Sequence, residues 1–530
     1  METMIHNPIL KGFHPDPSIC RVGDDYYLAT STFHWFPGVE IHHSRDLVNW
    51  ELINRPLDEE RLIDMTGTPD SGGVWAPCLS YDEGLFYLAY SNVKTFHNYY
   101  KDVDNYLTVS SSIMGPWSDL IYLNSSGFDP SMFHDSDGRK YVLNLLWDHR
   151  DRIHQFDGIV LQEYDKTLKK LVGEPVKIFA GSDLGFTEGP HLYKVNGLYH
   201  LICAEGGTFY GHAATMARAS DIRGPYELSP YHPLLSTRDH PDQKMQKCGH
   251  GSLVETQNGE WYIFHLCGRP NGTQQRCMLG RETAVQKARL TDEGWFVLDS
   301  ESGLPEELVK PPQMLPFTVA ETPEKLVFPG SLPKEFQTLR RPLNQSFMSF
   351  NEERQALILY GKESMESLHM QSLVGIRRTD FYFEAETKLR FEPIHYQQMA
   401  GLSLYYDTTN YFYLNLSWDE NEGRVLTLVV CDHGSKKISG TPHPLETDQE
   451  FVLLKMVVRN AQASFWWSAD GADYQSIGEV LDASQLSDDY YDEEIHGLRF
   501  TGTFVTLSCQ DTSGRRWPAE FEYLKYKALD

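Results

Sequence analysis

The sequence lacks the features that mark membrane proteins, secreted proteins and cysteine-based metal sites. No apolar run approaches the roughly 18 residues of a membrane-spanning helix, so no membrane partner is expected. The stretch from Met1 to Pro8 has neither a basic segment nor an apolar core, so no secretory signal is visible. None of the eight cysteines forms a Cys-x-x-Cys pair, so neither a zinc site nor a thioredoxin-like site is indicated. We expect a reduced, cytoplasmic protein without a cofactor.

Positive charge is scarce. The chain has 47 lysines and arginines against 74 aspartates and glutamates, a formal net charge of −27 over 530 residues. Nucleic acids and anionic membranes need cationic surfaces, so both are excluded as expected partners. A neutral or cationic ligand is compatible with this charge, which also favours solubility. Aromatic residues make up 13% of the chain, which suits both the core of a β-protein and the stacking of rings on sugars.

Helical periodicity is also scarce, and one pattern of strands occurs five times. Each unit has a short polar start, an apolar strand, a turn and an aromatic strand, and the units recur roughly every 55 to 60 residues, which indicates a repeat architecture. Gly-containing turns such as Val195-Asn196-Gly197 join the two strands, as in β-hairpins. The units begin at His14-Pro15-Asp16-Pro17, Trp75-Ala76-Pro77, Phe128-Asp129-Pro130, Glu188-Gly189-Pro190 and His250-Gly251-Ser252.

These repeats predict an all-β protein whose first domain is a five-bladed β-propeller. Blades around an axis account for a period of this length, and the strand starts are placed near the central channel. The pattern ends near residue 300, and a proline-rich stretch follows. We therefore predict a propeller over 1–305, a linker over 306–322 and a jelly-roll-type β-sandwich over 323–530.

Three of the repeat starts carry a carboxylate: Asp16, Asp129 and Glu188. Carboxylates that converge in a channel repel one another and lose water, which raises at least one pKa and separates an acid from a base. Glycoside hydrolysis needs such a pair of carboxyl groups. Each residue alone has a plain structural explanation, since an acid at a strand start caps turns and Asp-Pro is a common turn dipeptide. The three together favour a catalytic site.

The motifs around these acids resemble the three catalytic motifs of glycoside hydrolase family 43. The likeness extends along essentially the whole chain, and its two-domain form resembles the β-D-xylosidases of that family. The residues that carry it include Trp35-Phe36-Pro37-Gly38-Val39, Asp46-Leu47-Val48-Asn49-Trp50, Gly73-Val74-Trp75-Ala76-Pro77, Lys247-Cys248-Gly249-His250, Gly280-Arg281-Glu282-Thr283-Ala284 and Cys509-Gln510-Asp511-Thr512-Ser513-Gly514.

The resemblance implies an exo-acting enzyme that releases D-xylose from the non-reducing ends of β-1,4-xylooligosaccharides with inversion. Asp16 matches the general base, Glu188 the general acid, and Asp129 a third acid that positions Glu188 and tunes its pKa. The inverting geometry needs room for a water molecule between base and acid. The family likeness also suggests a homo-oligomer, either a dimer or a tetramer.

Further residues carry over from the family by motif. Arg281 matches an arginine that contacts substrate hydroxyls, a role that suits its fixed fork of donors, although a structural ion pair is the alternative. Thr208 is a weaker match for a residue that lines the pocket. The aromatic walls of the pocket are matched by Phe33, Trp75 and Trp147.

Two residues have open roles. His250 begins the fifth unit and is expected to face the channel, where it contacts substrate or lines a water or metal site. Some family members hold calcium on the axis, but calcium takes six to eight oxygen ligands, so we expect no metal there. Phe504 lies in the second domain, and in similar xylosidases a loop of that domain closes one end of the active site with an aromatic ring. A phenylalanine in the sandwich core is the alternative.

Other functions remain open at this stage. The same acids serve α-L-arabinofuranosidases and bifunctional xylosidase/arabinofuranosidases. The invertase-like hydrolases combine a propeller with a sandwich, but they carry an Asn-Asp-Pro-Asn type motif and a Glu-Cys pair, whereas Glu188 is followed by Gly189. A non-catalytic carbohydrate-binding propeller is a further alternative, although it would not need all three acids.

Overall fold

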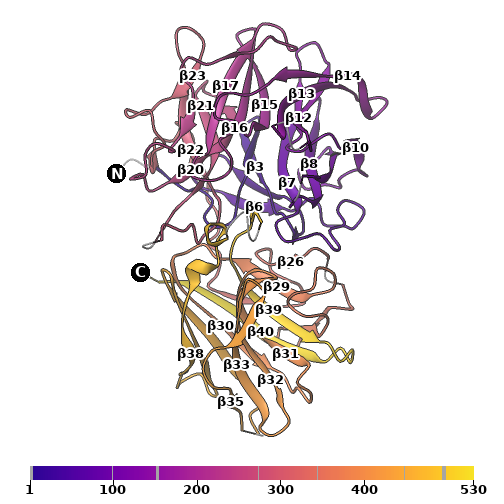
Figure 1. Cartoon of the computed structure of the whole chain (residues 1–530), viewed down its shortest axis with the longest axis vertical. Helices are drawn as coiled ribbons and strands as arrows, with labels where there is room; N and C mark the ends of the chain where they lie inside the picture. The colour runs from indigo at the N-terminus through magenta and orange to yellow at the C-terminus, as the bar shows by residue number, and fades with distance from the viewer. Residues whose placement is uncertain are drawn as a thin grey trace. The chain divides into compact units, whose positions relative to one another are not determined.

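The regular secondary structure consists almost entirely of β-strands, and the chain forms two compact units (Figure 1). The computed structural model describes residues 4–529 except 98, 151–153, 272–273, 343, 447 and 492–496. Among these residues, no helix is long and apolar enough to cross a membrane. The first unit comprises 1–63, 72–269 and 281–320, and the second comprises 64–71, 270–280 and 321–530.

Five antiparallel sheets build the first unit. The first sheet contains β2 (Ser18–Val22), β3 (Asp25–Thr30), β5 (Glu40–Ser44) and β6 (Glu51–Asn54), and the two-residue strand β4 (Trp35–Phe36) lies between β3 and β5 in sequence. The second contains β7 (Gly73–Asp82), β8 (Leu85–Thr95), β9 (Asp102–Ser110) and β10 (Ile121–Asn124). The third contains β11 (Ser131–His134), β12 (Lys140–Trp147), β13 (Phe156–Asp165) and β14 (Lys170–Phe179). The fourth contains β15 (Glu188–Val195), β16 (Leu198–Glu205), β17 (Ala213–Ala219), β18 (Glu227–Leu228) and β19 (Leu235–Ser236). The fifth contains β20 (Gln246–Glu255), β21 (Trp261–Gly268), β22 (Glu282–Leu290) and β23 (Phe296–Leu298).

The first strands of the five sheets form a closed ring. Strand β2 contacts β7, β7 contacts β11, β11 contacts β15, β15 contacts β20, and β20 contacts β2. Each sheet is therefore a blade whose first strand lies innermost. This arrangement confirms the predicted five-bladed propeller.

The hairpins inside the blades follow from local sequence. In β3 the side chains of Tyr26 and Leu28 are fully buried, as the period of two in a strand requires. The turn between β15 and β16 contains Asn196 at φ 51° and Gly197 at φ 80°, the left-handed pair that a type I′ turn needs. The turn residues thus set the register of the two strands.

The start of the chain closes the ring of blades by pairing with the fifth blade. Leu10 and Thr283 form an antiparallel bridge, and the N–H of His14 donates to the carbonyl of Arg281 at 2.9 Å. Strand β1 (Ile5–His6) pairs with β24 (Leu308–Val309). Much of the proline-rich stretch after the fifth blade therefore packs on the first unit.

The second unit is a sandwich of two antiparallel sheets. In one sheet the order is β27-β28-β40-β30-β36-β37-β38, with β25 beside β40; in the other it is β34-β33-β32-β31-β39-β29-β26, with β35 beside β33. The first sheet consists of β25 (Lys325–Val327), β27 (Met348–Asn351), β28 (Ala356–Tyr360), β30 (Tyr382–Arg390), β36 (Val452–Arg459), β37 (Gln462–Ser468), β38 (Gln475–Asp482) and β40 (Pro518–Ala528). The second consists of β26 (Gln337–Leu339), β29 (Ser372–Arg377), β31 (Gln398–Asp407), β32 (Asn410–Asp419), β33 (Gly423–Asp432), β34 (Ser435–Ile438), β35 (His443–Pro444) and β39 (Phe504–Asp511). Two short 3-10 helices, η1 (Ala483–Gln485) and η2 (Asp488–Tyr490), precede β39.

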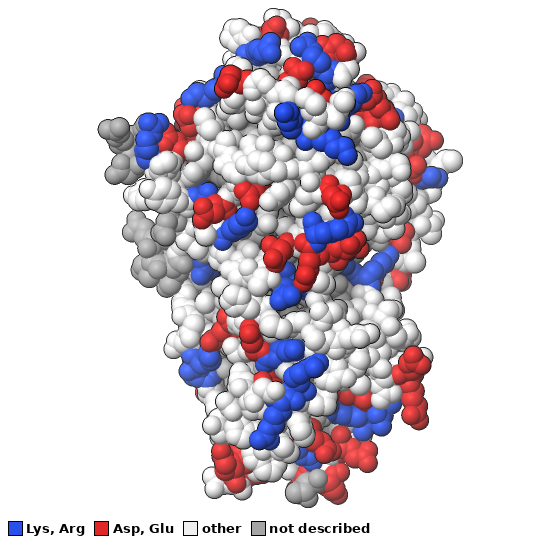
Figure 2. Space-filling model, turned by 90° about the vertical axis from the view of Figure 1, so that its right-hand side faces the viewer, with Lys and Arg blue, Asp and Glu red and all other residues white. Residues whose placement is uncertain are grey.

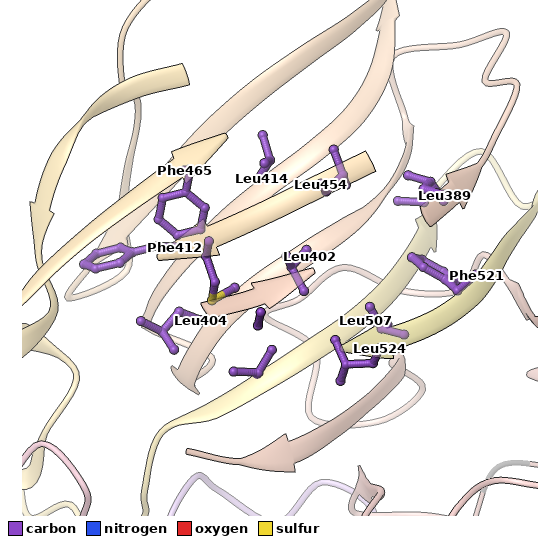
Figure 3. Packing of buried hydrophobic residues seen from close by; sticks show 14 of the residues in the cluster. Leu389, Leu402, Leu404, Phe412, Leu414, Leu454, Phe465, Leu507, Phe521 and Leu524 are labelled. Atoms are coloured by element: carbon purple, nitrogen blue, oxygen red, sulfur yellow. The ribbon is translucent and has the colours of Figure 1, made fainter. Parts of the chain in front are cut away.

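Apolar side chains from both sheets fill the space between them (Figure 3). Leu402 and Leu414 come from one sheet, and Leu454 and Phe521 come from the other; all four belong to one buried cluster. The alternation of apolar and polar residues along these strands explains the two layers. The predicted β-sandwich is confirmed.

A buried ion pair fixes the segment 64–71 within the second unit. The Nη2 atom of Arg340 lies 2.6 Å from Oδ1 of Asp70, and its Nε donates to the carbonyl of Thr68 at 2.6 Å. The N–H of Thr408 donates to the other carboxylate oxygen of Asp70 at 3.1 Å. Nothing in the local sequence marks Asp70 as part of a buried pair, because its partners are far along the chain.

The surface carries both signs of charge. Figure 2 shows Lys and Arg residues interspersed with Asp and Glu residues on the face in view.

All eight cysteines are buried, and none forms a disulfide within the described part of the chain.

Candidate active site

Every blade of the propeller has a residue in the left-handed backbone region, either within its innermost strand or two residues before it. The φ angles are 57° at Asp16, 32° at Ala76, 56° at Asp129, 56° at Gly189 and 46° at His250. Non-glycine residues rarely take this conformation, and aspartate tolerates it better than most. The repeat in the sequence therefore reflects a backbone conformation that recurs in all five blades.

Glu188 does not occupy the same repeat position as the two aspartates. Gly189 is their structural equivalent, so Glu188 lies one residue earlier and corresponds to Trp75 and Phe128 in the neighbouring blades. The expectation of three acids at equivalent positions is thus wrong by one residue. Gly189 is also sterically required, because a Cβ atom there would lie 2.9 Å from the ring of His250.

Asp16 is buried and contacts three polar side chains. The hydroxyl of Ser31 donates to its Oδ2 at 2.6 Å. Nη1 of Arg281 lies 3.4 Å from its Oδ1, and Nδ1 of His250 lies 4.0 Å from the same oxygen. The carboxylate is therefore fixed in orientation by neighbours from its own and the fifth blade.

Arg281 connects several of the predicted site residues. Besides Asp16, its Nη1 contacts the Oγ1 of Thr208 at 3.2 Å, and its guanidinium carbon lies 5.0 Å from the ring centroid of Phe33. Only 4% of Arg281 is exposed. Its planar guanidinium presents a rigid set of donors.

The other two acids lie close enough to influence each other. The N–H of Gly189 donates to Oδ2 of Asp129 at 3.1 Å. Burial, followed by the negative charges of Glu188 and Asp16, raises the pKa of Asp129 well above its usual value. Burial and the charge of Asp16 raise the pKa of Glu188 to about 8, although Arg281 opposes this shift. A carboxyl group that stays protonated near neutral pH can donate a proton to a reacting group.

A lysine that the sequence did not indicate also acts on Glu188. Lys101 lies between β8 and β9, with its Nζ 4.3 Å from the ring centroid of Trp147 and donating to the carbonyl of Phe96 at 3.0 Å. Burial lowers the pKa of Lys101 to about 8, and its positive charge lowers the pKa of Glu188. It belongs to an irregular loop, so no spacing pattern singles it out.

The predicted aromatic residues form a continuous series. The ring centroids of Phe33 and Trp75 lie 5.9 Å apart, those of Trp75 and Phe128 lie 5.5 Å apart, and those of Phe128 and Trp147 lie 6.0 Å apart. Phe128 was not predicted as a site residue. The repeat alignment was the signal that could have found it, because Phe128 and Trp75 precede equivalent residues.

His250 lies among buried histidines beside the acids. Burial lowers the pKa of His250, with Arg281 acting in the same direction and Asp16 opposing it. Burial and the neighbouring His250 lower the pKa of His212 to about 3 and that of His191 to about 3. The rings of His191 and His212 are therefore neutral over the range in which most enzymes work.

One group of residues has the composition of a metal site. The ligand atoms of His14, Glu40 and His42 lie within 4.8 Å of one another, and all three residues are buried. However, Nε and Nη2 of Arg55 both contact Oε1 of Glu40, and Nε2 of His14 lies 3.1 Å from Oε2. The arginine already neutralises the carboxylate, so the group fits an ion-pair network better than a cation site.

Phe504 is the one predicted site residue that lies in the second unit. It is the first residue of β39 and is fully buried, with the guanidinium carbon of Arg377 5.4 Å from its ring centroid. The other nine predicted residues lie in the first unit.

Comparisons with known proteins identify both units. Residues 5–296 match the model of "Glycosyl hydrolases family 43", and residues 328–527 match the "Beta xylosidase C-terminal Concanavalin A-like domain". The chain is 47% identical to a "Beta-xylosidase" of Bacillus subtilis (strain 168), with 99% of each chain covered. It is 45% identical to "Xylosidase/arabinosidase 43B" of Humicola insolens, with 99% of this chain and 98% of the relative covered. A crystal structure of a xylan beta-1,4-xylosidase from Bacillus halodurans C-125 superposes with a TM-score of 0.96 at 49% identity, covering 99% of this chain and 100% of the other.

Proposed function

Because the chain belongs to glycosyl hydrolase family 43, we propose that it is an exo-acting β-xylosidase. It releases D-xylose from the non-reducing ends of β-1,4-linked xylooligosaccharides and inverts the anomeric centre. The full-length likeness to proteins named as β-xylosidases supports this substrate. The pairing of a propeller with the β-xylosidase C-terminal domain supports it as well.

In this mechanism two carboxyl groups act in a single displacement. Asp16 takes a proton from the attacking water, and Glu188 gives its proton to the leaving glycosidic oxygen. The Ser31 and Arg281 contacts hold Asp16 in a fixed orientation. Asp129 positions Glu188 through the N–H of Gly189.

The observation that carries the proposal is the environment of Glu188, which lies close enough to Asp16 for the two carboxyl groups to influence each other. Burial and the charge of Asp16 raise its pKa to about 8, so the carboxyl group remains a proton donor at neutral pH. The site thus holds one carboxyl group with a raised pKa and a second carboxyl group from a different blade. That division of roles is what an inverting glycosidase requires.

The remaining site residues would bind the sugar. Arg281 donates hydrogen bonds to vicinal hydroxyls, and Thr208 and His250 contribute polar groups beside it. The rings of Phe33, Trp75 and Trp147 form the apolar walls.

The decisive experiment combines a stereochemical measurement with one substitution. Proton NMR of xylobiose hydrolysis should show α-xylose as the first-formed anomer, and β-xylose appearing first would contradict inversion. The Glu188→Gln variant should bind xylobiose but lose turnover. Unchanged turnover would overturn the enzymatic assignment of Glu188.

A second activity is supported by one of the relatives. The Humicola insolens protein is named for both xylosidase and arabinosidase activity, so hydrolysis of α-L-arabinofuranosides is the second candidate. Measuring kcat/KM on 4-nitrophenyl β-D-xyloside and on 4-nitrophenyl α-L-arabinofuranoside ranks the two. A higher value on the arabinofuranoside would reverse the proposed order.

We propose further that the enzyme is a cytoplasmic homo-oligomer, either a dimer or a tetramer. The eight buried cysteines without a disulfide support a reducing compartment. Light scattering coupled to size-exclusion chromatography measures the oligomeric state. A monomer of 60.9 kDa would contradict it.

A further inference from the structure

Glu205 is a buried carboxylate in the fourth blade that no part of the proposed mechanism uses. It ends β16 and is fully buried. Among the described residues, no lysine, arginine or histidine forms an ion pair with it. A buried carboxylate without a cation is costly unless hydrogen bonds compensate for the lost water. Its partners therefore indicate what the residue does.

All three hydrogen bonds to Glu205 come from the segment that leads into Glu188. Its Oε1 accepts from the N–H of Ser182 at 2.7 Å and from the hydroxyl of Thr187 at 2.7 Å. Its Oε2 accepts from the hydroxyl of Ser182 at 2.5 Å. Thr187 is the residue directly before Glu188, and it is only 2% exposed.

The segment 181–187 has an uncommon backbone conformation and close contacts with the end of β16. Phe186 is in the left-handed region at φ 55°, although 47% of it is exposed. A Cβ atom on Gly181 would lie 2.0 Å from the Thr187 hydroxyl oxygen, so only glycine leaves room for that hydroxyl. The N–H of Gly206, the residue after Glu205, donates to the carbonyl of Gly185 at 2.8 Å. The loop is therefore fastened to the end of β16 at several points.

Glu188 is thus bracketed by two carboxyl groups. Glu205 holds the residue before it through the Thr187 hydroxyl, and Asp129 holds the residue after it through the N–H of Gly189. Glu188 itself pairs in register with Ala204, the residue before Glu205. We propose that Glu205 is a positioning residue that sets where the proton of Glu188 is delivered. This role rests on the proposed function of Glu188 as the general acid.

The proposal predicts a dependence on the leaving group. A misplaced acid slows substrates whose leaving group needs a proton, such as xylobiose, and has little effect on 2,4-dinitrophenyl β-D-xyloside, whose leaving group departs without one. In Glu205→Ala we expect kcat on xylobiose to fall about 10- to 100-fold. On the dinitrophenyl substrate we expect a fall of less than about 3-fold.

Two further variants test whether the effect comes from the position of Glu188, from the charge of Glu205 or from misfolding. Glu205→Gln keeps an oxygen for Ser182 and Thr187, and the Ser182 hydroxyl can turn to accept from the new amide, so this variant should retain most activity on both substrates. Thr187→Val removes only the hydroxyl link and should reproduce the leaving-group effect even if Glu205→Ala does not fold.

Asp135→Asn provides a matched control. Asp135 is a buried carboxylate that accepts from Tyr199 in β16 and pairs with Lys194 in β15, so it supports the same two strands without touching the 182–187 segment. It should affect both substrates equally and only slightly. Equal losses on both substrates in Glu205→Ala and Thr187→Val, or a Glu205→Gln variant as impaired as Glu205→Ala, would overturn the positioning role. A wild-type protein that cleaves neither xyloside would instead contradict the proposed function.

Discussion

The backbone N–H of Gly189 donates a hydrogen bond to Oδ2 of Asp129, which belongs to the preceding blade, at 3.1 Å. Asp129 therefore acts on the main chain beside Glu188. The contact needs an oxygen acceptor at this point. Burial and the charges of Glu188 and Asp16 raise the pKa of Asp129, whereas this hydrogen bond lowers that pKa.

Replacing Asp129 should therefore distinguish the acceptor from the charge. Asp129→Asn keeps an oxygen for the Gly189 N–H, whereas Asp129→Ala leaves that N–H without an acceptor. We expect kcat on xylobiose to fall more in the alanine variant, by about 10-fold or more relative to asparagine, because the position of Glu188 is lost. An asparagine variant as slow as the alanine variant would mean that the charge matters instead.

Lys101 should set the alkaline limb of the pH profile. General-acid catalysis requires protonated Glu188, so kcat/KM falls as pH rises through its pKa of about 8. The positive charge of Lys101 lowers that pKa, so Lys101→Met should move the alkaline limb to higher pH. The control is Lys94→Met on β8, because Lys94 is half-exposed and paired with Asp104. A limb that stays in place or moves to lower pH would contradict the assignment.

Gly189→Ala should destabilise the propeller for two reasons. Its φ of 56° disfavours any residue with a Cβ, by about 1 to 2 kcal/mol. The new methyl group would also meet the ring of His250 at 2.9 Å. Thermal unfolding of the two single variants and the double variant checks this. The double variant Gly189→Ala/His250→Ala should lose less unfolding free energy than the two single variants together, by about 0.5 kcal/mol or more. Strict additivity would show that the two residues do not press on each other.

Removing one partner of the Arg340–Asp70 pair should strongly destabilise the second unit. Arg340 is 1% exposed, so Arg340→Met leaves the carboxylate of Asp70 buried without its cation and should cost about 3 to 5 kcal/mol. Arg354→Ala is the control, because Arg354 is half-exposed and reaches Glu520 only at 3.3 Å; it should cost less than about 1 kcal/mol. Calorimetric unfolding checks both, and equal losses would contradict this ranking.

The propeller was predictable because each blade repeats a turn that the sequence shows directly. Asp-Pro in two blades, Ala-Pro in one and Gly-Pro in another mark the left-handed residue and the strand that follows it. The same alignment, read strictly, places Glu188 one residue earlier than the aspartates.

Lys101 and Glu205 were not predictable in the same way. Lys101 lies over the ring of Trp147 in another blade, and Glu205 accepts hydrogen bonds from the loop before β15; each lies in or beside an irregular loop. The 64–71 segment was assigned to the propeller from its place in the sequence, but Asp70 is fixed by Arg340 in the second unit. Contacts of this kind depend on tertiary structure and leave no local periodicity.

The pairing of the first residues with the fifth blade has a consequence for insertions and deletions. Leu10 bridges Thr283, His14 pairs with the backbone of Arg281, and Asp16 follows two residues later. These main-chain contacts therefore fix the position of the proposed base, Asp16, relative to Arg281. Gaining or losing one residue between Leu10 and Asp16 would shift the carboxylate past its partner while every catalytic side chain was still present. The number of residues between Leu10 and Asp16 should therefore matter for catalysis as much as the identity of the catalytic residues does.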